Sequence, residues 1–448
     1  MSNYTKATNF ASKDALLTGN PLKIVKGTEI DNEFNAISTA VSTKFDTTAL
    51  AAPGPIGATT PAAISGTTGT FSGAVSGTTG TFSGNVQMAS LNGGQLAGLR
   101  NKIINGGMTV LQRGTGAVTT NVAGTAFYVA DRFFGATLAT GAVVTAGNAV
   151  NTSLSLSGTQ TIYLQTSTIK SVLLTGDYSY IGHYVEGLNV ADLKFGTASA
   201  KTITISFRAR ADNIGSTAVI SVSLRNSANN RAYCVPVTIT NANASYSVTI
   251  PGDTSGTWLT DTGIGLKVGF ACAGGATFIA STDSAWVASG ALCASTQTNF
   301  LGTATASLNI TDVQLEVGPV ATPFEQRPYG MELALCQRYF YAYTCGSSGA
   351  GDFGTGYLRS TTSFVTSIKM PVLLRIAPTA ISFSGAVGDY TYQAGGTTCV
   401  VNGIAAVAYG TDSSSVEFTS ATASTVGFGG RVYGSAGART LYFSGSEL

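Results

Sequence analysis

The sequence predicts a mainly β protein that is built from several domains and assembles as a homotrimer. This prediction depends on three observations: a scarcity of charge, an abundance of glycine, and a short repeat that follows a helix with one apolar face. Charged residues make up 10% of the 448 positions and glycine occupies 55 of them, which suits short strands joined by small-residue turns. Hydrophobic residues reach 44%, more than a disordered chain carries.

Composition divides the chain into five segments. We expect a polar head with a short coiled coil, a linker, a repeat shaft, an antiparallel jelly-roll or β-sandwich domain, and a small C-terminal β domain that forms the tip, over 1–46, 47–64, 65–98, 99–330 and 331–448. The linker contains three prolines, which prevent the preceding helix from continuing.

A helix is predicted near the end of the head. Thr28 is a favourable N-cap, and Asp31 three residues later is a weak capping-box partner. The large apolar side chains that follow recur at spacings of four, three and four: Ile30, Phe34, Ile37 and Val41. This spacing is that of a coiled-coil seam, and so short a helix is marginal in water without partners. Self-association would cover the seam, and packing on another part of the same chain is the alternative.

The repeat shaft opens with two nearly identical units. SGTTGTFSGAV (65–75) is followed at once by SGTTGTFSGNV (76–86), and ten of the eleven positions agree. One unit has too few apolar side chains to form a core, so it must stack on neighbours or on other chains. Three chains wound together would bring the copies of Phe71, and those of Phe82, close to a common axis. A flexible tether is the alternative.

A succession of strands is predicted over residues 99–325. In KTITISFRAR (201–210), Ile203, Ile205 and Phe207 alternate with polar residues, as in a half-buried strand. Similar segments occupy 217–225, 234–240 and 306–317. Short strands at this spacing indicate an antiparallel sandwich or jelly roll. The remaining predicted elements are a helix over 330–341 and strands within 362–375 and 439–448.

Few residues suit catalysis or metal binding. His183 is the only histidine, so Ser–His–Asp and Cys–His groups have no other candidate base. The six cysteines are scattered without a C-x-x-C pair, and we expect them to be reduced and buried rather than disulfide-bonded or bound to zinc. No phosphate-binding glycine motif occurs. We therefore predict no enzyme, no metal and no cofactor.

A pair of carboxylates is the route to an enzyme that the sequence leaves open. Glycoside hydrolases use two acids on either side of the sugar bond. The densest acidic group within the predicted jelly roll is Asp177, Glu186 and Asp192. Structural or solvated acids are the simpler interpretation of this group.

Charge and hydropathy argue against two classes of partner. The formal net charge is +2 and no basic block occurs, so we expect no nucleic-acid binding. No apolar run approaches 18 residues, so we expect no membrane insertion. The first ten residues, MSNYTKATNF, lack an apolar signal core, so we expect no cleaved leader.

Aromatic side chains with polar neighbours are the candidates for receptor binding in the C-terminal domain. Two glycine-rich segments, 351–360 and 388–396, supply them. The predicted receptor contacts are Tyr357, Arg359, Asp389, Tyr390 and Tyr392. Packing in the core or between trimer subunits is the alternative for each of these residues.

Two motifs resemble the opening and the close of a domain found in bacteriophage tail-fibre and tail proteins. The opening is NKIINGGMTVLQRGT (101–115) with YVADRFF (128–134), and the close is ITDVQLEVGPVATPFEQRPYGMELALCQRYF (310–340). Residues 1–35 resemble segments that attach phage tail proteins to the virion, and the ending LYFSGSEL fits the same group. The resemblance implies a jelly roll akin to carbohydrate-binding modules within a homotrimeric fibre.

The resemblance also implies structural roles for the matching residues. Residues 101–108 would form the first strand of the domain and residues 310–317 its last. Asp131 and Arg132 would form a pair near a sheet edge. The prolines that would lead the chain out are Pro319, Pro323 and Pro328. No motif within 345–448 points to a receptor class.

Together these features predict a bacteriophage tail-fibre subunit, which is a structural protein of the virion assembled in the host cytoplasm. Its N-terminus would dock on a tail, baseplate or portal-proximal protein, and the homotrimer would attach to a host-surface glycan or protein. A tail-spike depolymerase that hydrolyses host polysaccharide is one alternative. A purely structural collar, head fibre or adaptor is another.

Overall fold

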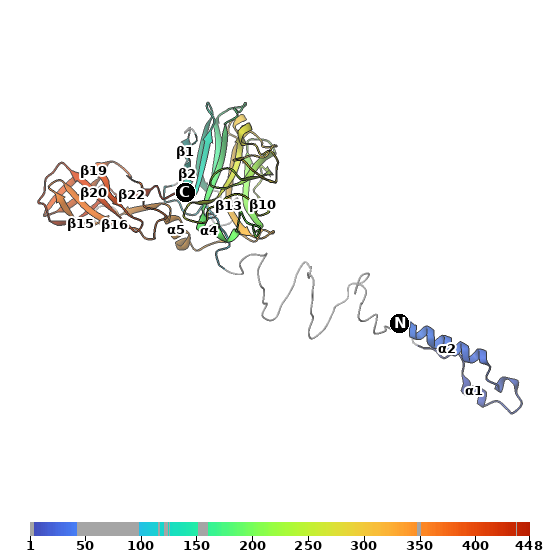
Figure 1. The fold of residues 1–448 in the computed structure, drawn as a ribbon. Helices are drawn as coiled ribbons and strands as arrows, with labels where there is room; N and C mark the ends of the chain where they lie inside the picture. The colour runs from blue at the N-terminus through green and yellow to red at the C-terminus, as the bar shows by residue number, and fades with distance from the viewer. Residues whose placement is uncertain are drawn as a thin grey trace. The chain divides into compact units, whose positions relative to one another are not determined.

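The computed structural model of the chain (Figure 1) describes residues 4–42, 98–114, 117–120, 124, 126–150, 160–346, 351–435 and 437–448. Two compact units are present, Met1–Val86 and Gln87–Leu448. The predicted linker and nearly all of the predicted repeat shaft, with Phe71 and Phe82, lie outside the described residues. The trimer contacts expected of these two phenylalanines therefore stay predictions.

Three helical elements make up the described part of the first unit. They are α1 Phe10–Asp14, the 3-10 turn η1 Pro21–Lys23 and α2 Gly27–Ser42. The backbone N–H of Lys26 donates to Glu29 Oε2 (2.9 Å), so α2 begins before Thr28. This corrects the predicted cap of Thr28 and Asp31, because Glu29 reaches back to the residue before the helix as the glutamate of a capping box does.

The residues that precede α2 fold back onto it through polar contacts. Glu33 Oε2 accepts hydrogen bonds from the backbone N–H groups of Ala7 (2.9 Å) and Thr8 (2.8 Å), and Lys13 forms an ion pair with Glu29 (2.7 Å). The predicted seam residues are between 38% and 64% exposed: Ile30, Phe34, Ile37 and Val41. The described part of this unit thus leaves the apolar seam of α2 uncovered.

The second unit contains a sandwich of two antiparallel sheets (Figure 1). The six-stranded sheet has the order β1-β4-β5-β13-β7-β10, with bounds Ala117–Thr120, Val143–Val150, Gln160–Thr168, Ser307–Val317, Ile203–Asp212 and Ala244–Ile250. The seven-stranded sheet has the order β12-β9-β8-β11-β6-β3-β2, with bounds Trp286–Val287, Ala232–Thr240, Thr217–Arg225, Ile264–Gly274, Tyr178–Glu186, Phe133–Leu138 and Phe127–Ala130. The connecting segments include α4 Gly187–Val190, η2 Ala191–Leu193, η3 Ala276–Phe278 and η4 Phe300–Gly302. The predicted mainly β, antiparallel fold class is confirmed.

The main core lies between the two sheets. On β7, Ile203, Ile205 and Phe207 are buried in it, whereas Ser206 and Arg208 are partly exposed on the other face. This is the alternation that the sequence predicted for a half-buried strand. The strands predicted at the positions of β8, β9 and β13 are also present.

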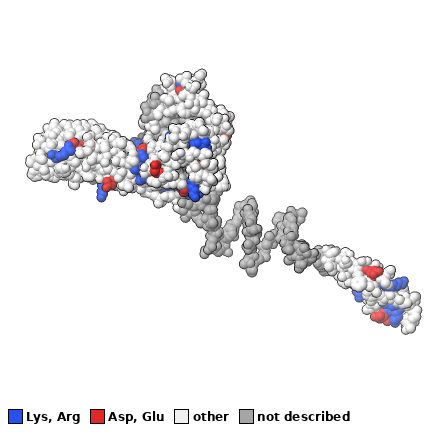
Figure 2. Space-filling view, in the orientation of Figure 1, with Lys and Arg blue, Asp and Glu red and all other residues white. Residues whose placement is uncertain are grey.

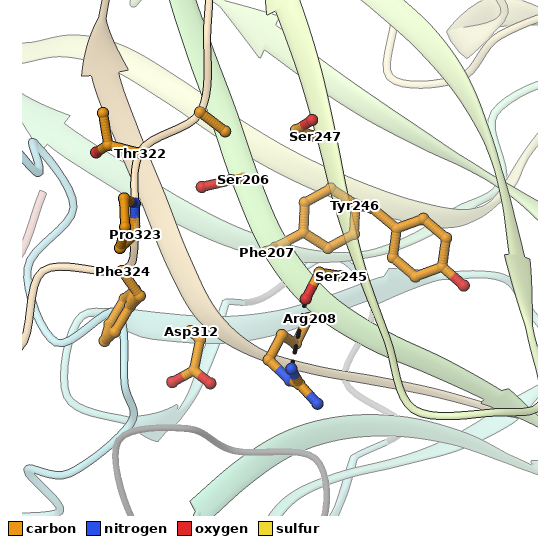
Figure 3. A pocket seen from close by; sticks show the side chains of 11 residues that line it. Ser206, Phe207, Arg208, Ser245, Tyr246, Ser247, Asp312, Thr322, Pro323 and Phe324 are labelled. Atoms are coloured by element: carbon orange, nitrogen blue, oxygen red, sulfur yellow. Dashed lines mark hydrogen bonds between the residues drawn. The ribbon is translucent and has the colours of Figure 1, made fainter. Parts of the chain in front are cut away.

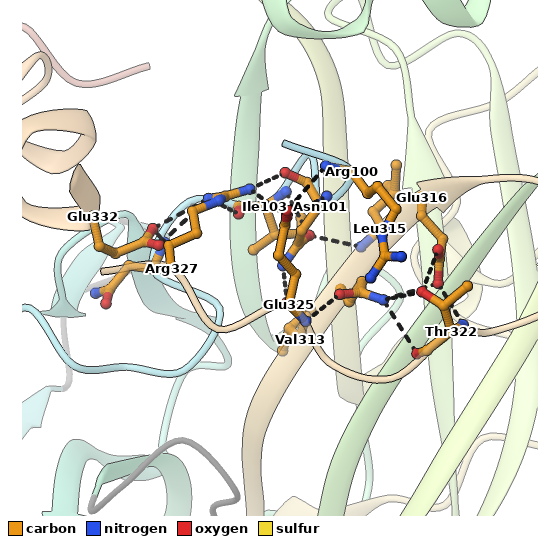
Figure 4. Close-up of polar contacts among 12 residues, drawn as sticks. Arg100, Asn101, Ile103, Val313, Leu315, Glu316, Thr322, Glu325, Arg327 and Glu332 are labelled. Carbon is orange, nitrogen blue, oxygen red and sulfur yellow. Dashed lines mark hydrogen bonds and ion pairs between the residues drawn. The ribbon is translucent and has the colours of Figure 1, made fainter. Parts of the chain in front are cut away.

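The motifs that open and close the sandwich contact each other (Figure 4). Residues 101–108 form turns rather than the predicted first strand. The Asn101 side chain donates to the carbonyl oxygen of Val313 (3.0 Å), and its backbone N–H donates to Glu325 Oε2 (2.9 Å). Arg327 donates to the carbonyl oxygen of Asn101. These residues do not pair as a strand because their polar groups bond β13 and the closing motif instead.

The C-terminal part of the second unit is a closed barrel with a small sheet. Helix α5, Tyr329–Gln337, precedes it close to the predicted 330–341. The three-stranded sheet has the order β14-β22-β17, with bounds Tyr341–Cys345, Arg439–Ser444 and Ala380–Phe383. The barrel has the order β15-β16-β20-β19-β18-β21, with bounds Gly354–Ser360, Ser363–Lys369, Ser413–Ser420, Thr397–Tyr409, Tyr390–Ala394 and Gly429–Gly434, and the turn η5 Val387–Asp389 precedes β18.

Charged side chains join the end of the chain to the sandwich, and Figure 1 places the C-terminus beside β2. Glu447 accepts from Arg113 Nη2 (2.8 Å) and from Arg132. The expectation that Asp131 and Arg132 pair with each other is wrong. Asp131 accepts from Arg113 (3.2 Å), because the turn between β2 and β3 directs the two neighbouring side chains to different partners.

Charge is sparse on the face of the molecule that Figure 2 shows. Basic and acidic side chains are scattered over it in small groups, and white side chains dominate. Among the helices of the described ranges, none combines the length and the hydropathy needed to cross a membrane.

Candidate functional site

Three of the predicted receptor contacts lie at strand β18 of the barrel. The rings of Tyr390 and Tyr392 have no exposed surface and pack inside the barrel. This corrects the expectation that they present faces to a receptor and favours the alternative of core packing, because residues two apart on a strand share its inner face. Asp389 accepts from Arg439 (2.8 Å), and this bond anchors the turn before β18.

The other two predicted receptor contacts lie on strand β15. Tyr357 is 53% exposed, and Arg359 forms an ion pair with Glu417. An exposed tyrosine beside an arginine is available to a partner, so a receptor role for Tyr357 and Arg359 stays a prediction.

The residues weighed as catalytic or metal-binding candidates are engaged in packing. His183 is buried, and its Nε2–H donates to the carbonyl oxygen of Ile104 (3.1 Å). Burial, reinforced by the charge of Arg132, lowers the pKa of His183. All six cysteines are buried and free of disulfides. Within the described ranges, no cluster of three or more metal-ligating side chains occurs.

The three acids weighed as a hydrolytic group each have a cation of their own. Asp177, Glu186 and Asp192 form ion pairs of 2.9, 2.6 and 3.0 Å. Their partners are Lys170, Arg338 and Lys102, in that order. Each of the three carboxylates is therefore bound to a separate cation.

The candidate site is a pair of adjoining hollows on the outer face of the six-stranded sheet, which we call the polar groove. The first hollow, of about 330 Å³, is lined by residues that include Tyr163, Gln165, Arg210, Asp212, Ser307 and Asn309. The second, of about 250 Å³, is lined by residues that include Ser206, Arg208, Ser245, Asp312, Pro323 and Phe324. The two hollows adjoin along β7, because Ser206 and Arg208 line the second hollow and Arg210 and Asp212 line the first.

Strand register aligns the side chains of the first hollow in two rows. Tyr163 on β5 is opposite Asn309 on β13, which is opposite Arg210 on β7. The next row along the same strands is Gln165, Ser307 and Asp212. Because residues two apart on a strand share a face, the two rows form one polar surface that carries a single aromatic ring, Tyr163.

Hydrogen bonds hold this surface in a defined arrangement. Arg210 Nε donates to Asp212 Oδ2 (3.1 Å), and Asn309 Nδ2 donates to the same oxygen (3.0 Å). Arg210 also donates to Asn243 (3.4 Å). Side chains that are already bonded to one another lose little conformational freedom when a ligand binds.

Figure 3 shows the second hollow, where Asp312 lies between Phe324 and Arg208. Asp312 has a positive φ of 50° at a bulge in β13, where the register with β7 shifts between Thr311 and Gln314. A bulge of this kind re-aims a side chain, and aspartate is among the few residues that tolerate the conformation. Arg208 in turn donates to Ser245 Oγ (3.4 Å).

The rim of the second hollow is part of the closing motif, which folds back along β13. The Thr322 N–H donates to Glu316 Oε1 (2.8 Å), and its hydroxyl donates to Glu316 Oε2 (2.7 Å). The Glu325 N–H donates to Gln314 Oε1 (2.8 Å). These bonds on either side fix residues 323–324, which form the apolar edge of the hollow.

The chemistry of the polar groove suits binding of a ligand rich in hydroxyl groups. Guanidinium and amide groups donate hydrogen bonds, and carboxylates and hydroxyls accept them. A tyrosine ring offers an apolar face on which a sugar ring can stack. Within this surface Asp212 accepts from Arg210 and Asn309.

Sequence reasoning did not single out the residues of the polar groove. The alternation predicted for 201–210 puts Ser206 and Arg208 opposite the apolar residues, and the same alternation extends to Arg210 and Asp212. Two arginines on the solvent face of one strand are a usable signal in a chain with so few charges. Tyr163 carried no comparable signal, because nothing local shows that β5 is two strands away from β7.

Comparisons with known proteins return remote structural similarities. No protein-family model matches the sequence, and no curated protein matches it. The enzymatically active domain of bacteriophage CBA120 tailspike protein 4 aligns at 12% identity over 48% of this chain, with a TM-score of 0.24. The alignment spans 21% of that tailspike chain, so this protein matches about a fifth of its length.

Two carbohydrate-binding modules align at the same level. One is TmCBM61 in complex with β-1,4-galactotriose, at 11% identity over 49% of this chain and 99% of the module, with a TM-score of 0.24. The other is the family 11 module from Clostridium thermocellum in complex with a mixed-linked tetrasaccharide, at 8% identity over 47% and 99%, also with a TM-score of 0.24. Similarity at these scores supports no conclusion about the function of this chain.

Proposed function

We propose that this chain is a bacteriophage tail-fibre subunit, a structural protein of the virion that attaches the particle to a host-surface glycan. The polar groove is the observation that carries the glycan-binding part of the proposal. It combines one tyrosine ring with fixed hydrogen-bond donors and acceptors, which is the composition that sugar recognition requires. The phage assignment is supported by the motifs at 101–134 and 310–340, which resemble those of tail-fibre proteins.

The proposal includes assembly as a homotrimer through the N-terminal part of the chain. The exposed apolar seam of α2 and the paired repeats at 65–86 support it, because both need neighbours to bury their apolar side chains. The head would dock on a tail, baseplate or portal-proximal protein. Three copies of a weak glycan site would then act together through their high effective concentration.

The experiment that tests the glycan-binding part is an array of bacterial surface polysaccharides probed with the full-length protein. Tyr163→Ala removes the stacking ring and should weaken binding to the recognised glycan by roughly tenfold. The matched control is Tyr409→Ala, which removes a partly exposed tyrosine from β19 of the barrel and should leave binding unchanged.

Three outcomes would count against the proposal. Binding to no glycan, or an equal loss in the two tyrosine variants, would remove the polar groove as the attachment site. Release of new reducing ends from the bound polysaccharide would replace attachment alone with hydrolysis, as in a tail-spike depolymerase.

A further inference from the structure

A pair of cationic side chains lies on the outer face of the seven-stranded sheet, the sheet that does not carry the polar groove. Arg225 ends β8, Lys267 lies within β11 and Tyr184 lies on β6. The register places Lys267 opposite Arg225 on one side and opposite Tyr184 on the other. Residues directly opposite each other on neighbouring strands share a face and are in contact range, so the two cations are side by side.

Both cations are more than nine-tenths buried. Arg225 is 6% exposed and Lys267 is 8% exposed. The ammonium group of Lys267 donates to the carbonyl oxygen of Ser227 and to Asn229 Oδ1, both at 2.9 Å. The Nε of Arg225 is buried and has no hydrogen-bond partner among the residues that the structure describes. A buried guanidinium nitrogen without an acceptor costs stability, and the Nε atoms of Arg100, Arg132 and Arg327 share this state.

In the described part of the second unit, no carboxylate compensates this pair. Within the described ranges, no aspartate or glutamate forms an ion pair with Arg225 or Lys267. The positions of 98–448 that lie outside these ranges include no acidic residue. Burial, with the neighbouring charge of Arg225, lowers the pKa of Lys267 to about 8. Two buried like charges without an anion are unfavourable, and the second unit does not supply the anion.

Two tyrosine rings lie beside the two cations. The guanidinium carbon of Arg225 lies 5.5 Å from the ring centre of Tyr180, and the ammonium of Lys267 lies 5.5 Å from that of Tyr184. The two tyrosine hydroxyl oxygens are 3.2 Å apart. The rings attract the cations only weakly compared with a carboxylate.

We infer that Arg225 and Lys267 bind a carboxylate of an acidic saccharide, such as a uronic acid of the host-surface glycan. This inference rests on the proposed glycan-binding function and names the class of glycan. A planar carboxylate matches the fork of a guanidinium group, and the ammonium of Lys267 supplies the second charge. The carboxylate would provide the acceptors that Arg225 lacks.

The test is an array of acidic bacterial polysaccharides, each printed beside a copy whose carboxyl groups have been reduced to alcohols. The wild-type full-length protein should bind at least one acidic polysaccharide and lose that binding when its carboxyl groups are reduced. Arg225→Gln and Lys267→Gln should each weaken binding by about tenfold to a hundredfold. The matched control is Arg431→Gln, which removes a more exposed arginine of the barrel and should leave binding unchanged.

The outcomes separate this inference from the proposed function. Equal binding to native and reduced polysaccharides would overturn the inference and leave glycan attachment standing, as would unchanged binding by Arg225→Gln. Binding to none of the polysaccharides would overturn both.

The stability of the ligand-free protein gives an independent measurement. Arg225→Gln removes an uncompensated buried charge, so this variant should unfold at the same urea concentration as the wild type or at a higher one. A lower unfolding midpoint would show that Arg225 stabilises the ligand-free fold, and would overturn the inference that its charge is uncompensated until an anion binds.

Discussion

Among single residues, His183 and Asp131 respond to burial in opposite ways. Burial, reinforced by the charge of Arg132, lowers the pKa of His183, so its ring is neutral in the folded protein. Burial raises the pKa of Asp131 to about 6, against the opposing effect of Arg113. Burial favours the neutral form of each group, so the two groups make stability depend on pH with opposite signs.

We expect the protein to lose stability in mild acid because of His183. An unfolded histidine takes up a proton near pH 6.5, whereas the folded ring stays neutral. Its contribution is therefore fully present above about pH 6.5 and is lost, by about 1.4 kcal/mol per pH unit, as the pH falls toward the folded pKa.

The variant His183→Gln isolates this effect. Glutamine does not titrate, so its free energy of unfolding in urea should fall less than that of the wild type between about pH 7 and pH 5. The chain has a single histidine, so the difference between the two curves reports this group alone. Parallel curves would contradict the prediction.

For Asp131 we expect the opposite change in stability with pH, over a range that overlaps that of His183. Its folded pKa is raised, so its contribution is fully present below about pH 4 and is lost as the pH rises through about 6. The loss amounts to at most about 3 kcal/mol for a shift of this size. Asp131→Asn keeps the acceptor for the Gln112 N–H and cannot ionise, so thermal unfolding of this variant should change less between these pH values than that of the wild type.

At the scale of elements, the positions of the strands could be predicted from the sequence, whereas the order of the strands within the sheets could not. Alternation is a local property, and it located β7, β8 and β13 correctly. The family resemblance implied a strand at 101–108, where the structure has turns whose partners, such as Glu325, lie more than two hundred positions along the chain. The polar groove was not predicted, because it too is formed by segments that are far apart in the sequence. It needs β5, β13 and β7 side by side, an order that these separated segments do not reveal on their own.

The segment after β22 should contribute strongly to stability through Glu447. Its carboxylate accepts from Arg113 and from Arg132, and the side chain of Arg132 is 1% exposed. Glu447→Gln would leave that buried guanidinium without its counter-charge, which typically costs about 3–5 kcal/mol. The measurement is the midpoint of urea unfolding, followed by circular dichroism.

A matched control is available in the barrel. Glu417→Gln breaks an ion pair with Arg359, whose side chain is 47% exposed, and exposed pairs contribute at most about 1 kcal/mol. A large shift for Glu447→Gln beside a small one for Glu417→Gln would confirm that the end of the chain is anchored by buried charge. Equal shifts would show that the two ion pairs contribute alike.

At the scale of the whole molecule, the two units differ in how much apolar surface each buries. The second unit buries its own cores within the sandwich and within the barrel. The described part of the first unit buries almost no apolar surface, and the seam of α2 is exposed. A helix of this length is stable in water only when a partner covers its apolar face, so the first unit is where assembly should be decided.

We expect Phe34→Asp to abolish trimer formation. Phe34 is 64% exposed in the single chain, and in a trimer its three copies would face one another, so aspartate would place three like charges in an apolar seam. Light scattering of the full-length protein should report three chains for the wild type and one for the variant. Leu17→Asp is the control, because Leu17 is 85% exposed and lies outside the seam, and this variant should remain trimeric. A wild-type monomer, or a Phe34→Asp trimer, would exclude the α2 seam as the site of assembly.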